Sequence, residues 1–240
     1  MLNILISFAC SALSSALMMR FVTPNIWIAM AVSAVVFAAI FMLLTRITMK
    51  KVGVLMEVAQ RDMLANRTDK AIKELQNGLK YGAWQIYVKQ QIYSQIGTIY
   101  YLKRDFKEAV PFLEKGFVRN WVGMAMLAIT YMKKNKTSKM IETFGKAVSG
   151  NRKEPMVYAV YAFCLDRVGE RSKAIEVLKK GISKTNDERL QENMNMLGAG
   201  KKMKMKGFGD MWYQFHLEKQ GAIIKKQTKA MTGRRKQVLR

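Results

Sequence analysis

The feature that most constrains the fold of this chain is a spacing of small and large side chains that occurs four times in register. In each window, a large apolar residue lies four positions after the first member, and a small residue lies three positions after that. The first members are Ala71, Ala109, Met140 and Ala174; the second are Leu75, Leu113, Phe144 and Leu178; the third are Gly78, Gly116, Ala147 and Gly181. Successive windows are 38, 31 and 34 residues apart. Self-similarity at this period indicates a helical repeat protein.

Each window is preceded by a second matching stretch. It contains a pair of a large and a small residue, followed three positions later by another side chain of the pattern. The pairs are Val58-Ala59, Ile96-Gly97, Leu127-Ala128 and Tyr161-Ala162, and the later positions are Asp62, Tyr100, Tyr131 and Leu165. Residues 52–200 show helical periodicity almost throughout, with only Pro111 and Pro155 inside them and no alternating run typical of a strand. The sequence therefore predicts an all-α fold built from paired helices.

The small residues have a physical reason. At Gly97 and Ala109 the two helices of one pair must approach closely, and Tyr100 and Leu113 then fill the space around the contact. Met140 departs from this pattern and predicts looser packing in the third pair. The predicted packing residues are Ala71, Gly97, Tyr100, Ala109, Tyr131, Phe144, Ala162 and Ala174.

This pattern resembles the tetratricopeptide repeat family, whose unit of about 34 residues is a pair of antiparallel helices. The resemblance covers about residues 52–184 and is strongest in the second and fourth units. It implies an α-solenoid of about four hairpins within a domain spanning 48–200. Residues 185–188 have the form of a capping box, which predicts one further helix that closes the array.

In this family, the first helices of successive units line a concave groove that binds protein partners. Carried over by register, the groove residues are Gln91, Ser94, Thr98, Tyr101, Val122, Ala125, Ile129, Met132, Met156, Ala159, Phe163 and Arg167. The apolar floor suits an amphipathic or extended apolar segment. The residue types do not match the Lys, Asn and Arg of the carboxylate clamp found in chaperone-binding members. An external protein and the chain's own Trp212 and Phe215 are alternative occupants of this groove.

The N-terminal region differs from the repeats because it lacks charge. Residues 2–19 and 21–45 contain no Asp, Glu, Lys, Arg or His, and only Arg20 separates them. As helices they would extend about 27 and 37 Å, against a hydrocarbon core of about 30 Å. We expect a transmembrane hairpin within residues 1–47, with spans at about 2–19 and 25–45 and a turn at 23–25. A cleaved or re-entrant first segment remains an alternative.

Positive charge predicts the orientation of this hairpin. Arg46, Lys50 and Lys51 follow the second span, whereas the loop between the spans carries only Arg20. The N-terminus and residues 46–240 are therefore expected on the cytoplasmic side. No organelle-targeting signal is evident, so the predicted location is a bacterial cytoplasmic membrane.

The C-terminal region, residues 201–240, is strongly basic. It contains 12 of the chain's cations and two acids, within a net charge of +24 for the whole chain. Residues 201–207 are expected to form a linker, followed by a helix from about Phe208 to Gly221 whose aromatic side chains could lie at a membrane surface. The predicted tail surface consists of Lys201, Lys202, Trp212, Phe215, Lys225, Lys226, Arg234 and Arg235.

The sequence carries no recognisable catalytic motif. His216 is the single histidine, and there is no phosphate-binding glycine loop, nucleophile elbow or cluster with metal-ligand spacing. We therefore expect no enzyme activity, cofactor or metal. The hypothesis from sequence is a membrane-anchored scaffold that positions protein partners at the cytoplasmic face, by analogy within an envelope-assembly complex. The alternative is an electrostatic binder of anionic lipid through the tail, or of nucleic acid, the less favoured ligand, with the repeats as a spacer.

Overall fold

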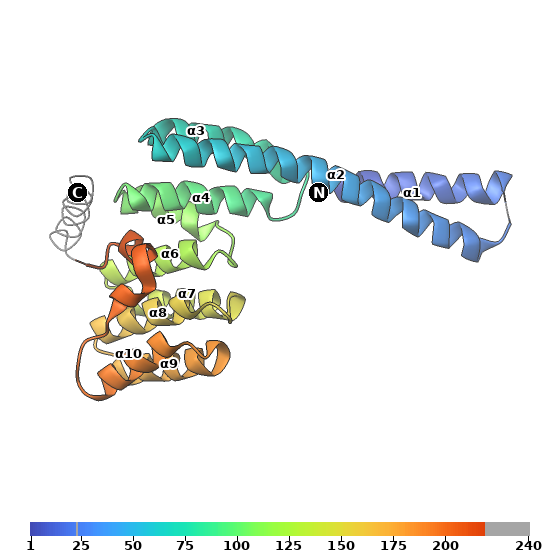
Figure 1. The fold of residues 1–240 in the computed structure, drawn as a ribbon. Coiled ribbons are helices and arrows are strands. Elements are labelled where there is room, and N and C mark those ends of the chain that lie inside the picture. The colour runs from blue at the N-terminus through green and yellow to red at the C-terminus, as the bar shows by residue number, and fades with distance from the viewer. Residues whose placement is uncertain (23, 219–240) are drawn as a thin grey trace, which may run out of the picture. The chain divides into compact units, whose positions relative to one another are not determined.

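The computed structural model describes residues 1–22 and 24–218, and these residues form helices joined by short connections (Figure 1). The chain divides into two compact units, Met1–Phe117 and Val118–Arg240. The N-terminal unit contains α1 (Leu2–Phe21), α2 (Ile26–Leu64), α3 (Thr68–Asn77), the 3-10 helix η1 (Gly78–Ala83), α4 (Val88–Leu102) and α5 (Phe106–Glu114). The C-terminal unit contains α6 (Trp121–Lys133), α7 (Thr137–Gly150), α8 (Pro155–Arg167), α9 (Arg171–Thr185), α10 (Glu188–Gly198) and the 3-10 helix η2 (Met205–Phe215). The predicted all-α class is confirmed.

The helices α1 and α2 form a long apolar hairpin at the N-terminus (Figure 1). By length and composition each can cross a membrane. Their apolar side chains face outward, as at Phe8, Trp27 and Val35, whose exposed fractions are 67%, 75% and 69%. A core helix of a soluble protein would instead bury such residues.

The helix α2 continues well beyond the predicted second span. It runs unbroken from Ile26 to Leu64, and its C-terminal part packs against α3 as the first hairpin of the repeat region (Figure 1). The predicted domain boundary between residues 47 and 48 therefore falls inside a helix. The sequence has no glycine or proline at this boundary that would end a helix. Gly53 lies a few residues further on and does not interrupt α2.

A buried polar cluster joins the start of α1 to the repeat region. Asn3 is fully buried, and its Nδ2 donates hydrogen bonds to Thr48 Oγ1 at 3.4 Å and Gln85 Oε1 at 3.1 Å. Ser7 Oγ donates to the Asn3 carbonyl at 2.7 Å, and the Met1 amino group donates to the Ala83 carbonyl. The first residues of α1 thus contact both α2 and the loop before α4.

The four helical hairpins α2–α3, α4–α5, α6–α7 and α8–α9 share one type of turn. Each first helix ends in a left-handed residue: Asn66, Arg104, Asn135 and Gly169. The backbone N–H of the residue that follows the left-handed one donates a hydrogen bond to the carbonyl five residues earlier. The accepting carbonyls belong to Asp62, Tyr100, Tyr131 and Leu165, at 2.8 to 2.9 Å. This is the Schellman arrangement, which satisfies the last carbonyls of a helix. The turns recur at the intervals found in the sequence, so the predicted register is confirmed.

Asp62 is the polar exception among these four positions. Its carboxylate is 2% exposed and pairs with Arg67 Nη2 at 2.9 Å and with Lys70 Nζ at 3.6 Å. An ion pair across the α2–α3 turn therefore replaces the apolar contact that Tyr131 or Leu165 makes elsewhere.

The predicted packing residues lie inside the hairpins. Tyr100 is half-buried and stacks on Phe112 with ring centroids 5.6 Å apart, and the other seven are buried. In the third hairpin, Ala128 and Met140 are both fully buried. The looser packing predicted for this hairpin is therefore not seen as exposure of either side chain. Pro111 lies inside the short helix α5.

Two predictions near the end of the array were wrong. Asp187, rather than Thr185, caps α10, because Asn186 adopts a left-handed conformation and ends α9. Residues 205–215 form 3-10 turns instead of an α-helix, since Gly209, with φ 73° and ψ −155°, interrupts the helical path. The predicted linker is also partly packed, as Met203 and Met205 are buried.

Candidate protein-binding face

The candidate site is the side of α6 and α8 in the C-terminal unit, which the register assigns as the inner face. Residues 203–217, here called the covering segment, lie against this face (Figure 1). The Trp212 ring meets Phe163 edge-on with centroids 4.8 Å apart, and Phe215 lies 6.1 Å from Trp121. Trp212 is 1% exposed and Phe215 is fully buried. Two aromatic side chains of the chain itself therefore fill the face.

Polar contacts from α10 hold the start of the covering segment. Asn193, which is 1% exposed, accepts a hydrogen bond from the Lys204 N–H at 2.6 Å and donates to the Lys204 carbonyl at 3.3 Å. Lys204 Nζ pairs with Glu192 at 2.8 Å. Because both main-chain groups of Lys204 are paired with one buried amide, the path of the chain at this point is set by Asn193.

The aromatic half of the segment is held by further contacts. The Arg189 guanidinium lies 4.5 Å from the centre of the Phe208 ring and donates to the Gly207 carbonyl at 3.4 Å. Trp212 Nε1 donates to Glu218 Oε1 at 2.8 Å. The buried indole thus keeps a partner for its N–H, as a buried tryptophan requires.

The predicted groove residues of the C-terminal unit lie on α6 and α8, the helices that the covering segment contacts. Ala125, Ile129, Met132, Met156 and Ala159 are buried. Val122 and Phe163 are half-buried, and Arg167 is exposed with its guanidinium 5.2 Å from the Phe163 ring centre. The chain's own segment contacts the face that the register assigns to ligands, through Phe163 and Trp121.

The predicted groove residues of the N-terminal unit divide into two kinds. Ser94 is buried, and its Oγ accepts a hydrogen bond from the Phe117 N–H at 2.7 Å. Tyr101 is fully buried, with its ring 5.1 Å from Phe106 in an edge-on contact. Gln91 and Thr98 are partly exposed. Ser94 and Tyr101 therefore stabilise this unit, and Gln91 and Thr98 are the two that reach the surface.

The predicted tail surface requires a correction. Lys201 and Lys202 are exposed, but Trp212 and Phe215 are core residues of the C-terminal unit and do not offer a membrane-facing stripe. The pattern that suggested such a stripe, apolar residues at helical spacing, is produced here by packing on α6 and α8. Lys225, Lys226, Arg234 and Arg235 lie outside the described residues.

Two contributors to the site were not predicted. Asn193 and Arg189 both lie on α10, the helix predicted only to close the array. An asparagine in an otherwise apolar helical stripe, next to Leu190 and Leu197, was the available signal for Asn193. For residues 1–22 and 24–218, no group of three or more His, Cys, Asp and Glu side chains is placed to hold a metal ion.

Comparison with known families addresses the repeats directly. Residues 90–117, which correspond to α4, α5 and the turns around them, match the family model described as tetratricopeptide repeat. The chain carries a tetratricopeptide repeat. A search of curated proteins found no match for the chain. The matched repeat is the second of the four hairpins, and repeats of this kind are associated with protein–protein interaction.

Proposed function

We propose that this protein is a membrane-anchored adaptor that recruits a protein partner to the cytoplasmic face of a bacterial membrane. In this proposal, α1 and the first part of α2 span the bilayer as a hairpin. The cations Arg46, Lys50 and Lys51 stay on the cytoplasmic side together with the repeats. The exposure of Phe8, Trp27 and Val35 supports this, because lipid is the solvent that such a surface requires.

The buried cluster around Asn3 supports a first span that stays in the mature protein. Cleavage as a signal peptide would remove Asn3 and leave Gln85 and Thr48 without their partner. The contacts of Asn3 with Thr48 and Gln85 also support an N-terminus on the same side of the membrane as the repeats.

The observation that carries the partner proposal is the covering segment itself. It lies against α6 and α8, on the face that the resemblance to tetratricopeptide repeats assigns to ligands, and it anchors there through Trp212 and Phe215. A segment of this type, with aromatic residues and methionines spaced along a non-α path, is the kind of ligand the face accepts. A partner with similar chemistry then has to displace the segment, and this competition lowers the apparent affinity of the protein for the partner.

The experiment compares partners captured from detergent-solubilised membranes. The baits are the wild type, a chain ending at Lys202, and that shorter chain with Phe163→Glu, each washed at about 1 M salt, where exposed charges are screened within roughly 3 Å. We expect the shorter chain to capture more of a specific partner than the wild type, and the Phe163→Glu version to lose it. Circular dichroism must show all three baits folded.

Two results would count against the proposal. One is an identical set of captured proteins for all three baits, which would make the covered face irrelevant to recruitment. The other is release of the wild type from membranes by alkaline carbonate, which extracts peripheral proteins and leaves spanning helices in place.

A further inference from the structure

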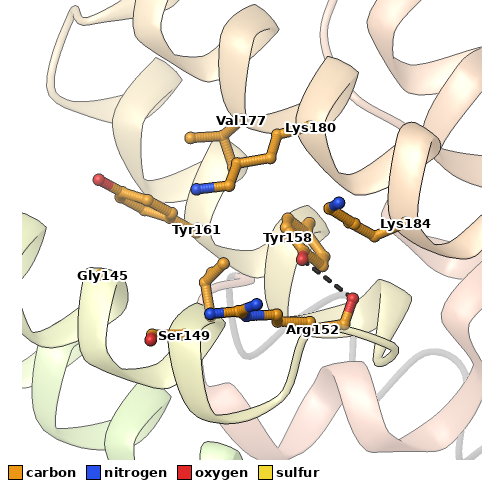
Figure 2. Close-up of a pocket in the computed structure, with 9 residues that line it drawn as sticks. Gly145, Ser149, Arg152, Tyr158, Tyr161, Val177, Lys180 and Lys184 are labelled. Carbon is orange, nitrogen blue, oxygen red and sulfur yellow. Dashed lines mark hydrogen bonds between the residues drawn. The ribbon is translucent and has the colours of Figure 1, made fainter.

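A cleft on the C-terminal unit, separate from the covered face, has the composition of an anion-binding site. It has a volume of about 500 Å³ and lies between α7 and α9, with α8 contributing its floor (Figure 2). The lining residues are Gly145, Val148, Ser149, Arg152, Tyr158, Tyr161, Val177, Lys180 and Lys184. The volume is within the range of ordinary small-molecule sites, about 300–1,000 Å³.

Three cations surround this cleft. Arg152 comes from the loop after α7, and Lys180 and Lys184 come from successive turns of α9, so their charged ends approach from different sides (Figure 2). No acidic residue is among the lining residues. The ion pairs found in the part of the chain that the structure describes involve none of the three. A concave surface with one sign of charge concentrates the field and attracts counter-ions.

Apart from Ser149, the rest of the cleft is lined by glycine, valine and tyrosine, and contacts within the unit hold both tyrosines in position. The Tyr161 ring stacks on Phe144, with centroids 4.8 Å apart and an interplanar angle of 16°. The Tyr158 hydroxyl donates to the Arg152 carbonyl at 3.0 Å, which holds the loop that carries the guanidinium (Figure 2). Burial raises the pKa of both tyrosines, so these rings stay neutral near pH 7 and add no competing negative charge.

We propose that this cleft binds a phosphate ester, with the phosphate oxygens on Arg152, Lys180 and Lys184 and the attached organic group against Tyr161 and Val177. Guanidinium and ammonium groups form strong charge-assisted hydrogen bonds with phosphate, and three such groups match a diphosphate or triphosphate. The site goes beyond partner recruitment, because none of its residues belongs to the face under the covering segment. The ester is either a soluble compound such as a nucleotide or the headgroup of a phospholipid.

The test is calorimetric titration of the full chain in an uncharged detergent. The probes are inorganic pyrophosphate, ATP and dihexanoyl phosphatidic acid, with citrate as a polyanion that lacks phosphorus. The site variant is Arg152→Gln with Lys180→Gln. The matched control is Lys153→Gln with Lys179→Gln, which removes two cations at adjacent exposed positions that do not line the cleft.

We expect at least one phosphate probe to bind more tightly than citrate, and the site variant to weaken that binding about tenfold or more while the control changes little. Tighter binding of ATP or pyrophosphate identifies a soluble ligand, and tighter binding of the short phosphatidic acid identifies a lipid headgroup. The proposal is overturned if no phosphate probe binds at concentrations up to about 10 mM. It is also overturned if citrate binds as well as they do, or if both double variants lose affinity equally.

Discussion

Replacing Trp212 with alanine is expected to release the covering segment from α6 and α8. The substitution removes a side chain that is 1% exposed, together with its edge-on contact with Phe163 and its hydrogen bond to Glu218. Truncation of a buried tryptophan typically costs about 3–5 kcal/mol. The loss cannot exceed the free energy with which the segment binds to α6 and α8, because the segment detaches once that free energy is used up. We therefore expect the segment to detach while the helices beneath it stay folded. Amide hydrogen exchange would show faster exchange in residues 205–217.

The neighbouring residue provides the control for this change. Met211 is 42% exposed, so Met211→Ala should leave exchange in the segment nearly unchanged, with an effect below about 0.5 kcal/mol. Unaltered protection in Trp212→Ala would mean that the polar contacts of Lys204 and Asn193, not the aromatic anchors, keep the segment in place.

Alanine substitutions at two glycines of the N-terminal unit are expected to have opposite effects on its stability. At Gly97 a new Cβ would lie 2.7 Å from Leu113 Cγ and 3.0 Å from the Leu113 backbone nitrogen, so α4 and α5 must separate. Overpacking of this kind costs about 1–3 kcal/mol, which outweighs the helix propensity gained. At Gly53 nothing lies within 4 Å of the new atom, so Gly53→Ala should stabilise the unit by about 0.5–1 kcal/mol.

The measurement is urea unfolding in detergent, followed by far-ultraviolet circular dichroism, with hydrogen exchange to assign the change to the N-terminal unit. The two variants add the same atom to a helix in the same unit, so helix propensity alone cannot separate them. Equal midpoints for Gly97→Ala and Gly53→Ala would show that α4 and α5 do not need a glycine at their contact.

The sequence was sufficient for the repeats because their positions follow from local rules. Two features recur at fixed intervals. One is a glycine or alanine where two helices touch, and the other is a residue able to adopt a positive φ four positions after Tyr100 or Leu165, whose carbonyl accepts the hydrogen bond of the turn. Such rules depend on neighbours within one hairpin. They gave the register, the hairpin pairs and the face on which ligands were expected.

The parts that sequence reasoning missed depend on contacts between distant segments or on main-chain geometry. The spacing of Phe208, Trp212 and Phe215 suggested an amphipathic helix, but it does not reveal that Gly209 turns the chain or that α6 and α8 offer the apolar surface. The continuity of α2 across the predicted boundary at residues 47 and 48 was also missed, because the sequence there changes from apolar to charged residues without any signal for or against a helix break. A helix passes from one solvent to another without any break in its backbone hydrogen bonds.

The C-terminal unit is proposed to have a peptide-binding face that residues 203–217 occupy. The most direct test of this proposal is fluorescence anisotropy of a labelled peptide spanning residues 203–218, titrated with the chain ending at Lys202 in detergent. We expect saturable binding that a Trp212→Ala substitution in the peptide weakens about tenfold or more, since a buried aromatic anchor dominates such contacts. Absence of binding, with the shortened chain folded by circular dichroism, would contradict the claim.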